Sequence, residues 1–281
     1  MEVTNQPFIF QADSPIVKAA YLDNDNFLIE YDKSQENKYC VIYFCSHNIY
    51  YPNTENSFKS SILDKNRYEW YGTRVKYAHK HIFIRDIQKQ WYLTGINENI
   101  NGPEKLLPFL QAETKGYQTI TLGSSAGGFA AVLYGSLLKA QLMLSFNGQF
   151  EIQSLLKTST ESVDPILFRF NKNKKSLNFF DVKPFIKKPE NIFYFYSMGS
   201  DIDSRQKEHI TDIKLNTISF KTSHHGVPFL KCNLPAVLTK SHQELISLSG
   251  KEHNPLWFSI QMVGLKETFN GFFSQILKRY F

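Results

Sequence analysis

The residues best suited to covalent chemistry lie in the segment YQTITLGSSAGGFAA, residues 117–131. Its centre has the pattern Gly-x-Ser-x-Gly, which follows a β-branched run and precedes a run of small residues. A serine at a turn from a strand into a helix stands exposed at the edge of a sheet, facing the first N–H groups of the helix. The pattern predicts that Ser125 is a nucleophile and that Ser124 is structural. The alternative is a turn that binds phosphate or merely reverses the chain.

With Gly123-Ser124-Ser125-Ala126-Gly127, the chain resembles the α/β-hydrolase superfamily, whose nucleophile motif these five residues match one for one. Outside this motif the resemblance rests on the order of elements over about residues 15–245. It implies a mostly parallel sheet and the chain order nucleophile, acid, histidine.

The resemblance implies a general base in the loop after the last strand of the sheet. The last candidate strand is Asn216–Lys221, and Thr222-Ser223-His224-His225-Gly226 follows it. His225, followed by Gly226, is preferred to His224 as the base. The histidines expected to have no catalytic role are His79, His81, His209, His242 and His253.

The acid of the implied triad has two candidates. Asp201 and Asp203 both follow the candidate strand Asn191–Ser197. Asp203 also has the spacing of a capping box with Gln206, which predicts a helix start there. The sequence leaves the choice between the two carboxylates open.

An oxyanion hole needs two N–H donors beside the nucleophile. The resemblance implies Ala126 as one donor. It places the other in the loop after the apolar run Cys40–Cys45, where Ser46 and His47 are the candidates.

Further side chains are candidates for lining a substrate pocket because they follow strands at the same edge of the sheet. For the first group, the alternative is a structural ion pair with a packed indole. The candidates are Arg85, Asp86, Gln90 and Trp91 after one strand, and Asn147 and Gln149 after another.

The elements that must position these residues alternate between strand and helix from about residue 80 to 220. This alternation predicts an α/β fold with a mostly parallel sheet flanked by helices. Val17–Leu22 and Asn26–Tyr31, around Asp23-Asn24-Asp25, are predicted to form an N-terminal antiparallel hairpin. The other predicted strands are Cys40–Cys45, His81–Arg85, Tyr117–Leu122 and Gln141–Phe146, and the predicted helices are Pro103–Lys115 and Ala126–Leu138.

The chain is predicted to be one domain over residues 1–281, because its triad residues must meet. Residues 150–190 are irregular and are expected to be a cap insertion. Residues 250–281 are expected to be a C-terminal helical extension. Its apolar spacing favours packing on the domain, and a homodimer or membrane-surface contact is the alternative.

Composition excludes several classes of protein. The 281 residues carry a net charge of +6 without a run of five basic residues, so nucleic-acid binding is not indicated. Three cysteines do not make a disulfide framework, and Cys40 and Cys45 would face opposite sides of a strand. There is no secretory signal, no apolar stretch long enough to span a membrane, and no metal-binding spacing. We therefore expect a cytoplasmic protein with no cofactor.

The predicted function is that of a serine hydrolase or O-acyltransferase that works through an acyl-enzyme. The chain is also similar in general layout to hydrolase-like proteins of bacterial surface-polysaccharide and glycoprotein biosynthesis, some of which are glycan O-acetyltransferases. The expected substrate is an ester of a glycan or a related small molecule. A separate acyl donor is a further partner to be considered if the protein is a transferase. The alternative is a non-catalytic scaffold or binding subunit of a biosynthetic or secretion complex.

Overall fold

A central sheet has the strand order β1-β3-β2-β4-β5-β6-β7-β8. The computed structural model describes residues 14–161, 165–171 and 177–280. Only β1 runs antiparallel to its neighbour, and the other strands pair in parallel. The predicted α/β fold with a mostly parallel sheet is therefore confirmed. The strands are β1 (Phe27–Tyr31), β2 (Tyr39–Phe44), β3 (Lys80–Ile84), β4 (Gln118–Ser124), β5 (Leu142–Phe146), β6 (Ile192–Ser197), β7 (Asn216–Phe220) and β8 (Glu252–His253).

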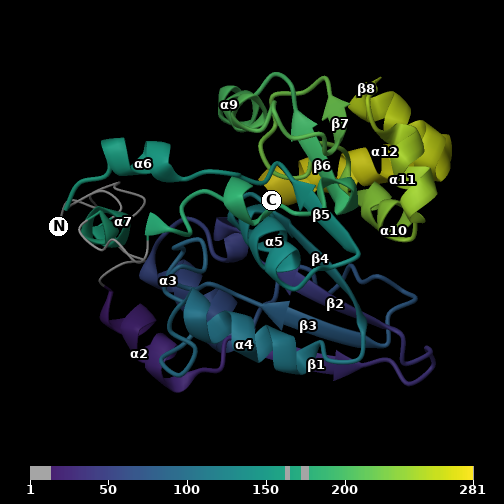
Figure 1. The fold of residues 1–281 in the computed structure, drawn as a ribbon. Helices are drawn as coiled ribbons and strands as arrows, with labels where there is room; N and C mark the ends of the chain where they lie inside the picture. Colours follow the sequence, from purple (N-terminus) through teal and green to yellow (C-terminus); the bar gives the residue numbers. More distant parts are fainter. Residues whose placement is uncertain (1–13, 162–164, 172–176, 281) are drawn as a thin grey trace.

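The central strands are apolar on both faces because helices cover both sides of the sheet. In β2, Cys40, Ile42 and Phe44 pack into one core with α4 (Pro103–Glu113) and α5 (Ala126–Leu137). Val41 and Tyr43 point into the opposite core. That second core also contains residues of α10 (Leu234–Leu238), α11 (His242–Leu248) and α12 (Pro255–Tyr280). Figure 1 shows α4 and α5 on the near side of the sheet.

The predicted N-terminal hairpin is wrong. Residues 17–22 lie in α2 (Pro15–Asp23), and β1 pairs with β3 instead. Pro15 stands at the start of the helix, where its fixed φ and missing N–H are tolerated. Val17 and Ala20, three residues apart, are buried on one face of α2. The helical spacing of these apolar residues, together with Ser14-Pro15, was the signal that sequence analysis passed over.

Residues 150–190 connect β5 to β6 and contain α6 (Gln153–Thr158) and α7 (Pro165–Phe170). Within this range, residues 162–164 and 172–176 lie outside the described part of the chain. The two ends of the segment are anchored, because Phe150 and Phe180 are buried in the core that α5 shares. Figure 1 shows α6 and α7 at the end of the sheet toward which β3 points. That is also the end at which β4 leads into Ser125.

The C-terminal segment forms α12, which kinks at Gly264, where φ is 82°. Phe258, before the kink, is buried in the second core. The part after the kink packs against the short helix η5 (Lys231–Asn233), and Gln275 accepts a hydrogen bond from the Lys231 N–H. A row of exposed apolar side chains follows one side of this part, namely Leu265, Phe269, Phe272, Phe273 and Leu277. Phe281 lies outside the described residues.

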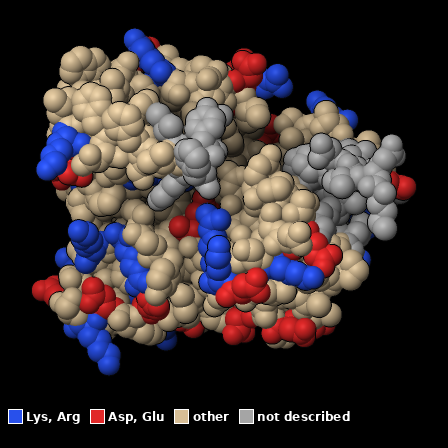
Figure 2. Space-filling model, turned by 180° about the vertical axis from the view of Figure 1, so that it is seen from behind, with Lys and Arg blue, Asp and Glu red and all other residues tan. Residues whose placement is uncertain are grey.

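Charge is mixed over the face drawn in Figure 2, where acidic and basic side chains are interspersed among the coloured residues. This face therefore carries no broad field of a single sign of the kind that binds nucleic acid. Within the described ranges, no helix has both the length and the apolar character needed to cross a bilayer. Cys40, Cys45 and Cys232 are free thiols.

The turn from β4 into α5 depends on an unusually close backbone approach. A Cβ added to Gly127 would lie 2.3 Å from the carbonyl oxygen of Phe44, at the end of β2. A Cβ added to Gly123 would lie 2.3 Å from the carbonyl carbon and oxygen of Gly127. Real Cβ atoms do not approach backbone so closely, so these two glycines let the first turn of α5 lie directly against the strand ends.

We expect Gly127→Ala to lower the free energy of unfolding by about 1–3 kcal/mol, because its methyl group must push α5 away from β2. Urea denaturation measures this change. Gly72→Ala is the matched control, since a Cβ there meets no atom within 4 Å. Its effect should stay within about 0.5 kcal/mol. Equal stabilities of the two variants would contradict the close packing.

Candidate active site

Ser125 stands at the turn between β4 and α5 in a strained conformation. Its φ is 52° and its ψ is −122°, a combination that non-glycine residues rarely adopt. The Ser125 N–H donates to the carbonyl of Phe146 at the end of β5 (3.0 Å), which helps to hold this conformation. The residue is half-buried, while its neighbour Ser124 is buried in the strand. The turn therefore presents the Ser125 hydroxyl at the carboxyl edge of the sheet.

Two hydrogen bonds connect Ser125 to a histidine and a carboxylate. The Ser125 Oγ lies 2.8 Å from Nε2 of His225, and Nδ1 of the same ring lies 2.9 Å from Oδ1 of Asp203. Asp203 is completely buried, whereas about a third of the His225 side chain is exposed. The three residues come from the ends of β4, β6 and β7, in the chain order that sequence analysis predicted. The arrangement suits proton transfer from the hydroxyl to an imidazole held by a carboxylate.

Of the two candidate acids, the structure brings Asp203 to the histidine and leaves Asp201 exposed. The helix α9 (Asp201–His209) begins three residues earlier than a capping box at Asp203 would place it. Its N-cap is Ser200, whose hydroxyl accepts the N–H of Asp203 at 3.4 Å. The spacing Ser200-x-x-Asp203 was the sequence signal for this start. Oδ2 of Asp203 is buried and has no hydrogen-bond partner within the described chain, so the bond to His225 is this carboxylate's principal contact.

The remaining histidines are not bonded to Ser125. His224 is exposed, and its ring lies against Gly226. His209 bonds to Asp181, and His81 bonds to the Tyr43 hydroxyl inside the sheet. The charge of His225 is among the causes that lower the pKa of the His47 ring.

The predicted oxyanion donors fall into two groups. Ala126 is the first residue of α5, and His47 is the first residue of the short helix η1 (His47–Ile49), so neither N–H has an acceptor within its helix. The N–H of Ser46 instead donates to the carboxylate of Glu69, and the Ser46 hydroxyl donates to the same carboxylate. The Ser46 N–H is thus already hydrogen-bonded to Glu69 and is not available as an oxyanion donor in this arrangement. Glu69 lies in an irregular segment without a motif, so no pattern in the sequence indicated its contact with Ser46.

The predicted pocket residues after β3 serve mainly to build the protein. Arg85 is buried, and its guanidinium bonds to the Asn26 side chain and to the Arg67 carbonyl. Asp86 is also buried and accepts the N–H groups of Gln88, Gln90 and Tyr92, which folds the loop that follows. Burial raises the pKa of the Asp86 carboxyl to about 6. Arg85 and Asp86 thus each bond to other groups of the protein.

Trp91 and Gln149 lie together near the site. The indole N–H of Trp91 donates to Oε1 of Gln149 at 2.5 Å. The Trp91 ring packs edge-on against the ring of His47, with 4.5 Å between centroids. The candidate Gln90 is buried, and its side-chain nitrogen bonds to the Gln88 carbonyl. Trp91 and Gln149 therefore support the loop that carries His47, whereas Gln90 belongs to the interior.

Asn147 is not placed to bind a substrate, which corrects the prediction for this residue. It is completely buried, and its side-chain amide bonds to Ser197 and to the carbonyl of His224. The amide thus joins the end of β6 to the loop that carries His225.

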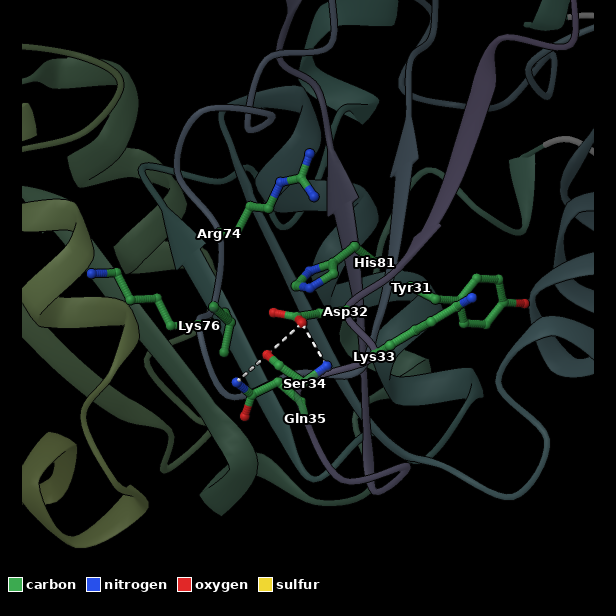
Figure 3. A pocket seen from close by; sticks show the side chains of 9 residues that line it. Tyr31, Asp32, Lys33, Ser34, Gln35, Arg74, Lys76 and His81 are labelled. Carbon is green, nitrogen blue, oxygen red and sulfur yellow. Dashed lines mark hydrogen bonds between the residues drawn. The ribbon is translucent and has the colours of Figure 1, made fainter.

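Two cavities differ in their relation to Ser125. A mainly apolar cavity of about 400 Å³ is lined by residues of the loop after β7 and of α12, among them His224, Val227 and Phe272, while His225 and Ser125 are not part of its lining. A larger polar cavity of about 690 Å³, drawn in Figure 3, includes Asp32 and His81. His81 is near the start of β3, whereas Ser125 follows the end of the parallel strand β4. The larger cavity is therefore at the opposite edge of the sheet from the candidate site.

No protein-family model matches the chain, and no curated protein matches it in sequence. Among solved structures, it is similar to a capsule O-acetyltransferase of Neisseria meningitidis serogroup A, with 14% identity and a TM-score of 0.48 over 69% of this chain and 83% of that one. It is also similar to an S-formylglutathione hydrolase of Staphylococcus aureus, with 9% identity and a TM-score of 0.45 over 76% of this chain and 87% of that one. Likeness at this level does not carry function over, so the function must be argued from the site itself.

His47 provides a test of the electrostatics of this site. Burial, with the positive charges of Lys89 and His225, lowers the pKa of its ring to about 3. The unfolded chain binds a proton at His47 below about pH 6.5 and the folded chain does not, so stability falls as the pH drops.

We expect His47→Phe to lose about 2 kcal/mol less free energy of unfolding than the wild type between pH 7 and pH 5. The phenyl ring retains the packing on Trp91 but has no proton to bind. Urea denaturation at several pH values measures the difference. An identical pH dependence in both proteins would show that the His47 ring titrates normally.

Proposed function

We propose that this chain is a serine hydrolase or O-acyltransferase in which Ser125, His225 and Asp203 form the catalytic triad. The observation that carries the proposal is the continuous pair of hydrogen bonds from Ser125 Oγ through the His225 ring to Asp203. The strained turn at Ser125 and the start of α5 beside it support the same function, because they expose the hydroxyl near unpaired N–H groups.

In the proposed mechanism, Ser125 Oγ attacks an ester carbonyl while Nε2 of His225 takes the hydroxyl proton. Asp203 accepts the hydrogen bond from Nδ1–H and stabilises the imidazolium. The N–H groups of Ala126 and His47 bind the oxyanion, in place of the occupied N–H of Ser46. His225 then protonates the leaving alcohol, which departs as the acyl-enzyme forms. Water or an acceptor hydroxyl then gives its proton to His225 and attacks the acyl group. As the bond to Ser125 breaks, His225 returns the proton to Ser125 Oγ.

The proposed substrate is an ester of a glycan or a related small molecule. The apolar cavity that His224 and Val227 help to line is suited to a non-polar part of such an ester, since its lining includes Val, Pro, Leu and Phe side chains. Discharge of the acyl group to water gives an esterase, and discharge to a sugar hydroxyl gives a transferase. The free thiols favour a reducing compartment, so we place the enzyme in the cytoplasm.

Labelling with a fluorophosphonate probe tests the nucleophile. We expect the wild type to be labelled and Ser125→Ala to remain unlabelled, because the probe phosphonylates an activated serine. Ser124→Ala is the matched control, since it removes the neighbouring hydroxyl, which lies buried in β4. Folded wild-type protein that resists the probe would instead favour a non-catalytic scaffold.

Exchanging each candidate acid tests the assignment of Asp203. We expect Asp203→Asn to lower kcat for an activated ester by about 10³–10⁴-fold, because the amide no longer holds the histidine in the required tautomer. Asp201→Asn, two residues away and exposed, should change kcat by less than about twofold. Steady-state hydrolysis of p-nitrophenyl acetate measures both. Comparable losses in the two variants would rule out Asp203 as the specific partner of His225.

A further inference from the structure

We infer that Asn147 and Ser197 are positioning residues that hold the His225 loop over the sheet. This inference rests on the proposed function, because it concerns how the base of that reaction reaches its nucleophile. Neither residue touches the Ser125 hydroxyl in the hydrogen bonds described. Their action is through the main chain of His224, which immediately precedes His225.

The order of the strands in the sheet constrains the path of the loop that carries His225. Ser125 follows β4 and the His225 loop follows β7, with β5 and β6 between them. Neighbouring strands are about 4.8 Å apart, so the two ends are separated by about 14 Å. A histidine side chain cannot span this distance from the end of its own strand. The loop after β7 must therefore turn back across the ends of β6 and β5.

Ser197 and Asn147 lie at the two strand ends that the loop has to cross. Ser197 is the last residue of β6, and Asn147 directly follows β5. The Asn147 side-chain oxygen accepts the Ser197 N–H at 2.8 Å, and the Asn147 N–H donates to the Phe195 carbonyl at 2.7 Å. Both residues are completely buried. The two strand ends are thus joined to each other before either contacts the loop.

The side chains of this pair then converge on a single acceptor. The Ser197 hydroxyl donates to the carbonyl oxygen of His224 at 2.6 Å, and the Asn147 amide donates to the same oxygen at 3.1 Å. The Asn147 amide also donates to the Ser197 oxygen at 2.8 Å. Both amide protons and the hydroxyl proton are therefore used, and both lone pairs of the His224 carbonyl are occupied. We call these two side chains and this carbonyl the His224 clamp.

The clamp acts close to the reacting atoms because the His224 carbonyl belongs to the peptide that enters His225. Gly226, on the other side of His225, has a φ of 119°, a conformation that gives the loop a sharp turn. A shift of about 1 Å in a catalytic group can cost about a hundredfold in rate. Loss of the clamp should therefore reduce kcat by displacing Nε2 of His225 from Ser125, with little effect on KM.

The backbone of Asn147 decides which substitutions are informative. Its φ is 45°, in the left-handed region that asparagine and glycine tolerate and that most side chains disfavour. Asn147→Gly therefore removes the amide while keeping the backbone conformation accessible. Ser197→Ala removes only the hydroxyl. The double variant removes every side-chain donor to the His224 carbonyl that the clamp supplies.

Hydrolysis of p-nitrophenyl acetate by the full chain tests the inference. We expect kcat to fall about tenfold in Ser197→Ala and about a hundredfold in the double variant, with KM changed less than about twofold. Asn191→Ala is the matched control, since its amide donates to the Ala140 carbonyl at the opposite edge of the sheet, at 3.0 Å. It should retain kcat within about twofold. A folded double variant with wild-type kcat would overturn the inference, and Ser197→Ala decides by the same criterion if the double variant does not fold.

A second measurement separates positioning from general damage to the site. His225→Ala should retain a small residual activity, since part of the catalysis in such sites survives loss of the base. Adding the two clamp substitutions to His225→Ala should reduce this residual activity by less than about twofold, because the His225 side chain that the clamp positions is already absent. A further hundredfold loss in that background would overturn the inference.

A crystal structure of the double variant gives a readout that does not depend on activity. We expect Nε2 of His225 to lie beyond hydrogen-bond distance from Ser125 Oγ, whereas an unchanged contact would overturn the inference. A wild-type protein without esterase activity or probe labelling would contradict the proposed function alone, and the clamp would still be decided by this structure.

Discussion

The contact on which the site depends is the 2.8 Å hydrogen bond between His225 Nε2 and Ser125 Oγ. It joins residues that follow β4 and β7, with two further strands between them. The sheet sets that separation, and no local feature of either segment can shorten it. The loop after β7 must therefore lie across the ends of the intervening strands. Much of the buried polar structure at this edge, including the bonds to the His224 carbonyl, meets that requirement.

A second constraint acts on the turn that carries Ser125. The close approach of α5 to the ends of β2 and β4 leaves no room for a side chain at Gly127 or Gly123. This packing forces the turn at Ser125 to be tight, and the tight turn places the residue at a φ of 52°. The strain is sustained because the helix and the strands around it are completely buried. The exposed hydroxyl is thus a consequence of core packing as well as of the motif.

The polar residues around the site form two groups. Some contact the Ser125 hydroxyl or the His225 ring, and the others hydrogen-bond to or pack against the loops that carry such residues. Asp86 organises the loop of Trp91, and Trp91 packs on His47, whose N–H is a proposed oxyanion donor. Asn147 supports His225 in the same indirect way. Such residues bind protein groups at a catalytic edge because a buried polar atom without a partner is costly. Arg85, Asp86 and Asn147 were candidates for a pocket lining because they follow strands at this edge of the sheet, and residues that support the site occupy the same kind of position.

What the sequence determined by itself was local. The apolar runs predicted most of the strands, and the Gly-x-Ser-x-Gly turn predicted Ser125, because both depend on neighbouring residues. It also limited the candidates for the general base to His224 and His225, with His225 preferred, and the candidates for the acid to Asp201 and Asp203. Of these, the tertiary structure joins His225 and Asp203 to Ser125 by hydrogen bonds, since such contacts depend on which side chain faces a strand end distant in sequence. It also paired β1 with β3, about fifty residues away, where a local hairpin had been predicted. Contacts between segments so far apart leave no spacing pattern along the chain, and for this reason the clamp on His224 and the role of Glu69 became visible only in three dimensions.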